Sequence, residues 1–406
     1  MSNFRIKPGI PGESHEKNSM MFLISVLLLW GLGIFTLFVC TPSTAERLFV
    51  NKYYFVTRQL IFSAVSFVGL IFFAIVPLKF IRKILPVFVL GTFILCFFPL
   101  IPKIGTTSHG ASRWVIIPHV GGFQPSEFAK FAVVLYLANL FEKYLGAVHK
   151  EEKNFLYPLL GLFAFVIVVF LQKDFSTGLF IFVVGVVMFF VSGAKMNWFV
   201  PLVILAIPCV LLLIAMEPYR IERLISHLHP EEYELTIGYQ RNAAARAIVN
   251  GGLWGNGMGS GLTSIHIPEI QTDYIFAGWC NAMGLLGVGA YLALLVFFSW
   301  RGYSIAFSTP NRFCCYGSFG CTTMILLQSI INIGVVCGFL PTTGIPLPFF
   351  SSGGTSLMVT MAMCGFILNC SHTSEDEGEI TSEYEDNTKT NSKFETIGGV
   401  VVENYE

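Results

Sequence analysis

An aspartate, Asp273, stands immediately before an apolar run that begins at residue 274. If that run crosses a membrane, the carboxylate lies at the membrane surface and is partly desolvated. Partial desolvation favours proton uptake, which suits a general base. The same position also suits a cap on the helix that follows, and one residue can serve both purposes. The chemistry predicted for Asp273 is therefore proton transfer, with helix capping as the alternative.

A second acidic residue, Glu127, lies at the start of another apolar run, 128–145. Pro125 and Ser126 are typical of a helix start, with Ser126 as the expected N-cap. Glu127 and Lys130 are three residues apart, so they share one helical face. Two interpretations follow: the pair is neutralised at the mouth of a helix, or it lines a polar cavity that accepts a charged headgroup.

A third polar group interrupts two apolar runs. Lys173 and Asp174 lie between the runs 156–171 and 174–192, which predicts the tip of a helical hairpin. Turn formation and capping explain these residues without any ligand. The alternative is that Lys173, a compact cation, meets a phosphate group.

Two further segments are rich in glycine or proline. Residues 251–261 contain spaced glycines without the Gly-Lys-Ser/Thr of a nucleotide P-loop, so they predict tight turns or close approach of a ligand. The prolines of 340–356 exclude a helix and predict a rigid loop, with Ser351 or Ser352 capping the next helix. Asn332 precedes this loop inside an apolar run and is expected to hydrogen-bond between helices.

The composition of the chain indicates which class of protein carries these polar residues. The chain has 406 residues, of which 54% are hydrophobic and only 12% are charged. Soluble domains average about 25% charged residues, so the composition excludes a soluble enzyme and a disordered chain. The formal net charge is zero, which gives no global field that would attract nucleic acid.

The predicted fold class is an all-α polytopic membrane protein with ten transmembrane helices. Apolar runs of about the length that crosses 30 Å of hydrocarbon recur along the chain. A long outer loop, 218–273, precedes the eighth run. The ten predicted spans are 20–40, 57–78, 84–101, 128–145, 156–171, 174–192, 197–217, 274–299, 316–340 and 353–371.

The basic residues of the short loops predict the orientation. With the N-terminus in the cytoplasm, about twelve Lys and Arg fall on the cytoplasmic side and about six on the other side. Both termini are then cytoplasmic, and all the polar groups above lie on the outer side. The predicted organisation is a cytoplasmic segment 1–19, a membrane domain 20–371 and an acidic tail 372–406. The tail has few apolar groups, so it is expected to be disordered.

The polar motifs, taken together, resemble the SEDS family (shape, elongation, division and sporulation), the polytopic FtsW/RodA proteins. Their order and spacing match the family from about residue 20 to 370, and the first two look more like the division branch. The matching stretches are HGASRW at 109–114, QPSEFAK at 124–130, QKDFSTG at 172–178, GYQ at 238–240, GGLWGNGMGSG at 251–261, PEIQTDYIFA at 268–277 and GIPLPFFSSGG at 344–354.

The resemblance implies an inverting glycosyltransferase that polymerises lipid II into peptidoglycan glycan strands during cell division. It also implies a class B penicillin-binding protein (a transpeptidase) and division-complex proteins as partners. The expected location is the bacterial inner membrane at the septum. Asp273 matches the essential aspartate of the family. The expected substrate-binding residues are Arg113, Trp114, Gln124, Ser126, Glu127, Lys130, Lys173, Asp174, Arg241 and Glu269.

The chain departs from the family in two places. The family usually has Glu-Glu-Leu-Gly where this chain has residues 280–284 without an acid, which puts a second carboxylate there in doubt. The second hairpin reads Gln-Lys-Asp instead of Gln-Pro-Asp. No His/Cys cluster has metal-ligand spacing, so a divalent cation (Mg²⁺ or Mn²⁺), if used, is expected to bind mainly substrate oxygens.

Three alternative functions stay open at this point. A lipid II flippase would place ionisable groups near the middle of the membrane and show broken helices in related halves. A RodA-like polymerase would act in elongation instead of division. A pseudo-enzyme scaffold would recruit the transpeptidase and tolerate the loss of Asp273.

Overall fold

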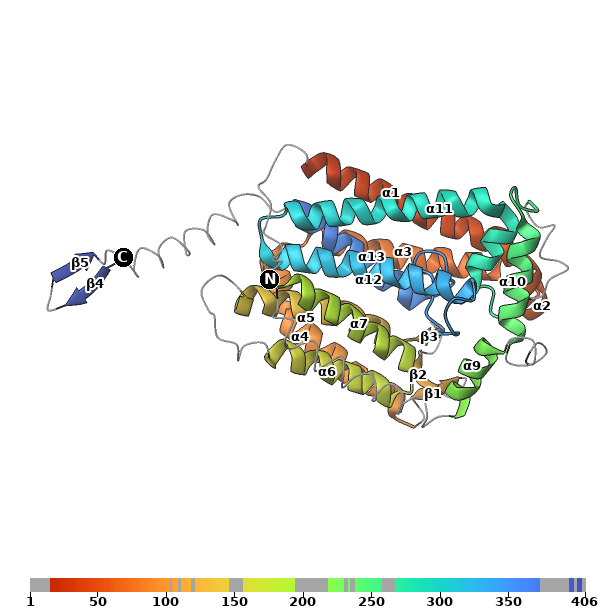
Figure 1. Cartoon of the computed structure of the whole chain (residues 1–406), viewed down its shortest axis with the longest axis horizontal. Coiled ribbons are helices and arrows are strands. Elements are labelled where there is room, and N and C mark those ends of the chain that lie inside the picture. The colour runs from red at the N-terminus through yellow and green to blue at the C-terminus, as the bar shows by residue number, and fades with distance from the viewer. Residues whose placement is uncertain are drawn as a thin grey trace.

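The computed structural model describes residues 15–102, 104–108, 111–117, 121–145, 156–193, 218–229, 233, 238–257, 267–372, 394–397 and 400–403. Long helices lie side by side in one bundle (Figure 1). They are α1 (His15–Cys40), α3 (Tyr54–Ile75), α4 (Leu78–Leu95), α5 (Pro125–Leu145), α6 (Leu156–Leu171), α7 (Phe175–Val191), α11 (Ile275–Ser308), α12 (Arg312–Val336) and α13 (Gly354–Ser371).

Several of these helices have the length and composition of membrane spans. Within the described residues, six qualify on both counts, and α6 and α7 are shorter apolar helices. The chain is therefore a polytopic helical membrane protein. Every predicted span except 197–217 coincides with a helix, and 197–217 lies outside the described residues, so ten crossings stay a prediction. The six qualifying segments are Asn18–Cys40, Tyr54–Ile75, Leu78–Leu100, Ile275–Ser308, Arg312–Val336 and Gly354–Ser371.

The centre of the bundle is α13. The most apolar stretch of α13 is 83% buried inside the structure. The corresponding stretches of α3 and α4 are only 22% buried, so these two helices lie at the outside of the bundle. Along one side α13 packs against α3, and its last turn fixes the end of that helix. The Asn369 amide donates to the carbonyls of Phe73 (2.7 Å) and Val76 (2.6 Å). Because α3 ends there, these carbonyls receive no hydrogen bond from a following turn of the helix.

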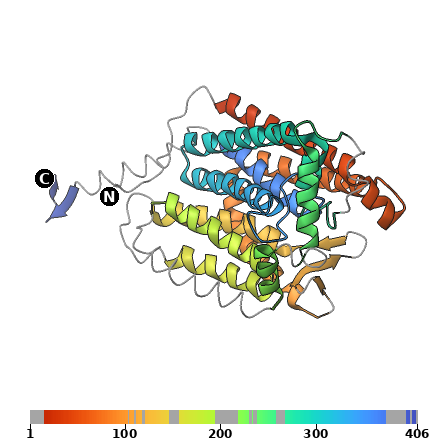
Figure 2. The same ribbon diagram turned by 45° about the vertical axis from the view of Figure 1, so that its right-hand side comes forward.

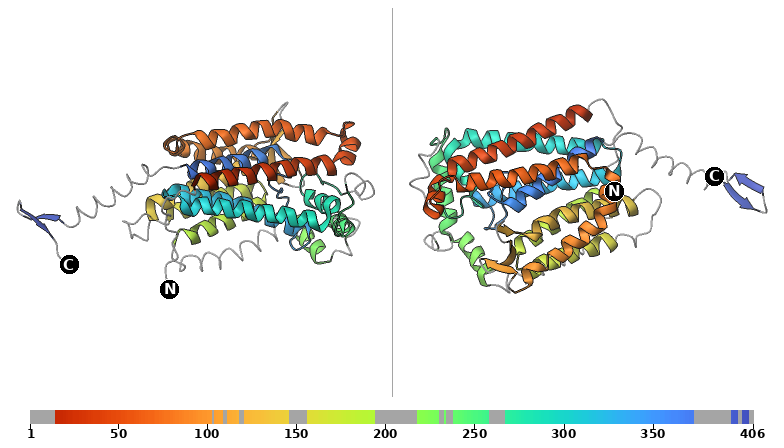
Figure 3. Two further views of the ribbon diagram at one scale, coloured as in Figure 1. Left: turned by 90° about the horizontal axis from the view of Figure 1, so that it is seen from above. Right: turned by 180° about the vertical axis from the view of Figure 1, so that it is seen from behind.

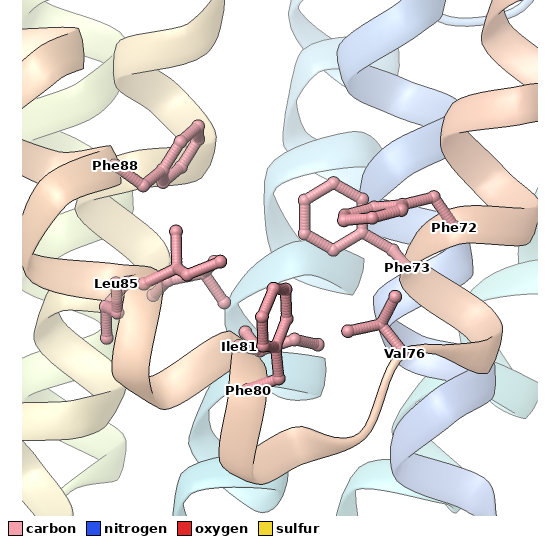
Figure 4. A pocket seen from close by; sticks show the side chains of 9 residues that line it. Phe72, Phe73, Val76, Phe80, Ile81, Leu85 and Phe88 are labelled. Carbon is pink, nitrogen blue, oxygen red and sulfur yellow. The ribbon is translucent and has the colours of Figure 1, made fainter.

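An apolar cavity opens between α3 and α4 beside the turn that joins them (Figure 4). Its volume is about 130 Å³, and its lining contains no polar side chain. Such a surface suits hydrocarbon and offers nothing for acid–base chemistry. The lining residues are Phe72, Phe73, Val76, Phe80, Ile81, Ile84, Leu85, Phe88 and Leu135.

A small antiparallel sheet corrects the all-α prediction. Strands β1 (Gly105–Ser108), β2 (Ala111–Ile117) and β3 (Gly121–Phe123) pair in the order β1-β2-β3. This segment was expected to be a structured loop because of its glycines and prolines. The strands form because β2 reads ASRWVII, in which apolar and polar residues partly alternate and β-branched residues end the strand.

The sheet gathers with short helices at one end of the bundle (Figures 1 and 2). These are α2 (Pro42–Phe49), the 3₁₀ turn Phe98–Leu100, α9 (Pro218–Leu228) and α10 (Tyr239–Gly251). The described residues of the predicted loop 218–273 therefore include two helices, α9 and α10. The start of α1 and the end of α13 lie at the opposite end of the bundle (Figure 3).

Two short strands lie in the acidic tail, which was predicted to be disordered. Strands β4 (Phe394–Ile397) and β5 (Val400–Glu403) pair as an antiparallel hairpin. The residues of these two strands are therefore not disordered in the structure. The residues between α13 and β4 lie outside the described part of the chain.

Candidate functional site

Asp273 lies in a tight turn just before α11. Its amide donates to the Glu269 carbonyl (3.2 Å), and its own carbonyl accepts from the Asn332 side chain on α12 (3.0 Å). The residue that precedes α11 is Tyr274, and α11 has no side-chain cap. Asp273 is therefore not the N-cap residue of α11, and its side chain is half-buried.

The loop that follows α12 is tied to this turn. Asn332 also donates to the carbonyl of Ile345 (2.9 Å), so one amide holds both segments. From the other end of the loop, the Ser351 hydroxyl donates to the Thr272 carbonyl (2.5 Å), and the Ser352 amide donates to the Gln271 carbonyl (2.7 Å). Neither serine caps α13, which begins at Gly354, so that expectation is wrong.

Asn332 and the two serines thus act locally, between α12 and the loops at this end of the bundle. Asn332 was expected to hydrogen-bond to another helix, and that expectation is wrong. The amide bonds backbone carbonyls of two non-helical segments. As a result, the turn of Asp273 and the 340–353 loop form one rigid unit.

Gly344 in this loop lies between an arginine and the catalytic candidate. A Cβ atom placed on Gly344 would be 3.5 Å from Arg113 Nη1 and 3.7 Å from Asp273 Oδ2. The guanidinium and the carboxylate therefore both lie within ordinary contact distance of the position that a Cβ on residue 344 would take. The φ angle of Gly344 is +71°, a conformation that glycine adopts with little strain.

Arg113 is held on its other side by Asp174. Its Nη1 lies 3.7 Å from Asp174 Oδ1, and the aspartate side chain is only 1% exposed. Two further groups bond the same carboxylate: Gln124 Nε2 at 3.0 Å and the Ser126 hydroxyl at 3.3 Å. The structure thus brings Arg113, Gln124, Ser126 and Asp174 together, with the Arg113 guanidinium reaching toward Asp273.

Asp174 and Ser126 were both expected to cap helices, and only Asp174 does so. Asp174 is the N-cap of α7, since its side chain accepts from the Thr177 amide (3.5 Å), so capping is confirmed. Ser126 lies inside the first turn of α5, which begins at Pro125, so it is not the N-cap. Its hydroxyl is directed to Asp174 instead.

Glu127 and Lys130 form a buried ion pair. Their charged atoms are 2.8 Å apart, and each side chain is 3% exposed. Lys130 also donates to Gln328 on α12 (2.8 Å), and Gln328 donates to the Pro346 carbonyl (2.9 Å). The pair neutralises itself inside the bundle and supports the 340–353 loop through Gln328.

The other predicted residues lie around this centre. Lys173 is exposed beside Asp174, in a left-handed turn with φ of +60°. Trp114 packs its indole on Gly122 of β3. The Glu269 carboxylate accepts from Gln271 (3.2 Å) and Thr272 (3.3 Å), so it stabilises the turn that carries Asp273. Arg241 on α10 donates to the carbonyls of His227 (2.7 Å) and Gly338 (3.4 Å).

Two arginines of α9 extend the site beyond the predicted set. Arg220 lies over the Phe175 ring, 5.0 Å from its centroid, next to Asp174. Arg223 donates to the Thr342 carbonyl (2.9 Å), close to Gly344. Their spacing of three residues places both on one face of a helix, which is the signal that could have identified them.

The glycine-rich run approaches the chain itself. The amides of Asn256 and Gly257 donate to the carbonyls of Asn281 (2.9 Å) and Ala282 (3.1 Å), and Gly255 touches Gly284 backbone to backbone. There α11 is interrupted, with Gly284 at φ +63° and ψ −164°. The tight turns predicted for these glycines are confirmed by the positive φ angles of Gly252, Gly255 and Gly257. The segment that they approach closely is α11, and close approach of a ligand stays a prediction.

No metal-ligand cluster exists among the residues that the structure describes. No three His, Cys, Asp or Glu side chains there group in a way that could hold an ion. The two carboxylates nearest the centre, Asp174 and Asp273, flank the cationic Arg113. The positive charge at this site is supplied by arginine, and the divalent cation stays a prediction.

Comparison with known proteins gives a consistent result along the chain. Residues 19–376 match the family model for the cell cycle proteins FtsW, RodA and SpoVE. Stage V sporulation protein E of Bacillus subtilis is 33% identical over 356 residues, which covers 87% of this chain and 96% of that protein. A probable peptidoglycan glycosyltransferase FtsW of Borreliella burgdorferi is 32% identical over 360 residues, which covers 88% and 98%.

Solved structures share the fold. A chain of a peptidoglycan synthase complex that coordinates polymerization and crosslinking aligns with a TM-score of 0.70 at 24% identity, covering 86% of this chain and 96% of that chain. The rod shape determining protein RodA of Thermus thermophilus aligns with a TM-score of 0.63 at 21% identity, covering 87% and 97%.

Proposed function

This chain belongs to the FtsW, RodA and SpoVE family of cell cycle proteins, and on that premise we propose that it is a peptidoglycan glycosyltransferase that polymerises lipid II. The observation that carries the proposal is that Asp273 and Arg113 both lie beside Gly344. Glycosyl transfer from a lipid diphosphate needs a base and a cation close together. Relatives named as probable peptidoglycan glycosyltransferases support the same activity.

The proposed mechanism is an inverting transfer with Asp273 as the general base. The carboxylate takes the proton of the acceptor sugar hydroxyl as that oxygen attacks the anomeric carbon of the donor. The new glycosidic C–O bond forms while the bond from the anomeric carbon to the diphosphate oxygen breaks. General-base assistance of this kind contributes about 10²–10⁴-fold to a rate.

Arg113 stabilises the departing diphosphate. Negative charge grows on the leaving oxygens, and a fixed guanidinium nearby stabilises that charge before any solvent must reorganise. The ion pair with the buried Asp174, with 3.7 Å between the charged atoms, favours this position of the guanidinium. A divalent cation would add positive charge through substrate oxygens, but the described residues offer it no ligand cluster.

The setting of the reaction is cell division at the septum of the bacterial inner membrane. Several relatives of 30–32% identity are named FtsW, which favours division over the elongation role of RodA. The partner is a class B penicillin-binding protein within the division complex, which would cross-link the strands that this chain makes. The synthase complex that shares the fold coordinates polymerization and crosslinking and supports this pairing.

Asp273 faces the outer compartment in this proposal, with ten crossings and both termini in the cytoplasm. Cysteine labelling tests the orientation. Lys52 is exposed at the end of the bundle that carries α2, and Lys79 is exposed in the first turn of α4 at the other end. The native Cys337 is exposed and is first replaced by serine. In that background we expect a membrane-impermeant maleimide to label Lys52→Cys in cells whose inner membrane is intact, and Lys79→Cys only after permeabilisation. The reverse pattern would exclude an outward-facing active site.

A lipid II flippase is the rival function. The break in α11 at Gly284 resembles the broken helices of transporters, but the glycine run of the same chain fills it. The buried charges of α5 neutralise each other. Neither feature offers an ion or substrate pathway.

Purified protein separates the two activities. A polymerase in detergent should convert lipid II into glycan strands, because the reaction needs no sealed compartment. Gel separation of labelled product is the measurement. Absence of polymer with the transpeptidase partner present, together with lipid II movement across sealed vesicles, would favour the flippase.

A further inference from the structure

The hydroxyl of Tyr274 is buried without a hydrogen-bond partner in the described part of the chain. The residue is 2% exposed and directly follows Asp273. A buried donor that bonds nothing costs stability, and an unsatisfied group of this kind needs a specific explanation. A ligand atom placed at the Tyr274 hydroxyl would complete its hydrogen bonding.

Two arginines supply positive charge near this hydroxyl. Arg223 of α9 and Arg241 of α10 both donate to carbonyls of the 338–342 segment, which leads into the loop beside Asp273. Burial raises the pKa of Tyr274 above its ordinary value, and the Asp273 charge adds to that rise, while Arg223 and Arg241 oppose it. The hydroxyl thus stays protonated and able to donate, and it lies within the field of both guanidinium groups.

A histidine lies beside one of these arginines, since Arg241 donates to the carbonyl of His227. The Nδ1 atom of His227, at the end of α9, is also buried without a partner among the described residues. Burial lowers the pKa of His227, and the nearby Arg241 lowers it further, so the ring is neutral at pH 7. A neutral imidazole has one N–H donor, whose position depends on the tautomer.

We propose that Tyr274, Arg223, Arg241 and His227 form a second anion-binding subsite that takes the phosphate oxygens of a lipid-linked diphosphate. This rests on the proposed function for the identity of the ligand. Transfer between two lipid-linked sugars requires places for two diphosphates, and the Arg113 guanidinium faces only one of them. The cluster offers two cations and two neutral donors, a set that suits a phosphate group.

Binding of an isoprenyl diphosphate to the purified full chain in detergent tests the subsite without requiring polymerisation. The probe is geranylgeranyl diphosphate, and geranylgeraniol is the same chain with a neutral end. We expect Tyr274→Phe to bind the diphosphate about tenfold more weakly, because a hydrogen bond to a charged group is lost. Binding of the alcohol should not change.

The melting temperature separates a ligand-binding role from a structural one. Tyr274→Phe removes an unpaired hydroxyl and keeps the ring, so its melting temperature should equal or exceed that of the natural chain. Tyr303→Phe is the matched control, since its hydroxyl bonds Thr323 (3.0 Å) within the bundle. That control should lose stability and keep its diphosphate affinity. Arg223→Gln is a second test variant and should also bind the diphosphate more weakly.

Competition identifies the source of the anion. Inorganic pyrophosphate that displaces the probe would show that the headgroup alone is recognised. Displacement only by phosphatidylglycerol vesicles would overturn the diphosphate assignment in favour of a phospholipid headgroup. Unchanged affinity in both Tyr274→Phe and Arg223→Gln would overturn the subsite. A natural chain that binds the diphosphate but makes no polymer would contradict the proposed function and leave the subsite intact.

Discussion

Asp273→Asn should abolish glycan polymerisation from purified lipid II. The amide keeps the size and shape of the carboxylate but cannot accept the proton of the attacking hydroxyl. The backbone bonds that position residue 273, to Glu269 and Asn332, do not involve the side chain and should persist. We expect the rate to fall by roughly a hundredfold or more, in line with the usual contribution of a general base. Polymer length and yield on gels give the measurement.

A carboxylate elsewhere at the same end of the bundle provides the control. Glu46 of α2 is exposed and belongs to none of the motifs around Asp273. Glu46→Gln should polymerise lipid II at the natural rate, and both variants should insert and melt normally. If Asp273→Asn supported cell division with unchanged polymer formation, the chain would act as a scaffold for the transpeptidase or use another base.

Gly344→Val should have the second largest effect. A branched side chain is strained at φ of +71°, and its Cβ would lie in the space between Arg113 and Asp273. The strained backbone and the bulk added beside the two charged groups are expected to shift one of them. We expect polymerisation to fall by roughly a hundredfold, because small displacements of reacting groups have effects of that size.

A second glycine of the same loop is the matched control for this variant. Gly353 has an extended backbone, with φ of −153°, and a Cβ there would meet only Ser356 at an ordinary distance of 3.7 Å. Gly353→Ala should retain most of the activity. Equal activity in Gly344→Val and Gly353→Ala would show that the space between Arg113 and Asp273 is not where the chemistry occurs.

The helices were predictable because a membrane imposes a length and a composition on each span. Even α5, which carries Glu127 and Lys130, was recognisable from its apolar remainder. The sheet β1–β3 was not predicted, because its short strands are separated by glycine and proline that favour turns. The two helices of the 218–273 segment were missed for a related reason. They are short and polar, and they lack the long apolar runs that marked the spans.

The site was predictable in its members but not in its contacts. The motifs named Arg113, Asp174 and Asp273 separately, and only the fold shows that Arg113 bridges the other two. Glu127 and Lys130 look the same in the sequence whether they meet a ligand or each other. The supporting roles of Asn332 and Gln328 depend on loop carbonyls, which carry no sequence signal.

The most direct test of the account measures bound lipid II and polymer on the same preparation of Asp273→Asn. A general base acts on a substrate that is already in place, so its loss should stop turnover and spare binding. We predict lipid II occupancy within a few-fold of the natural chain and no detectable polymer. Polymer at the natural rate from fully folded Asp273→Asn would contradict the account.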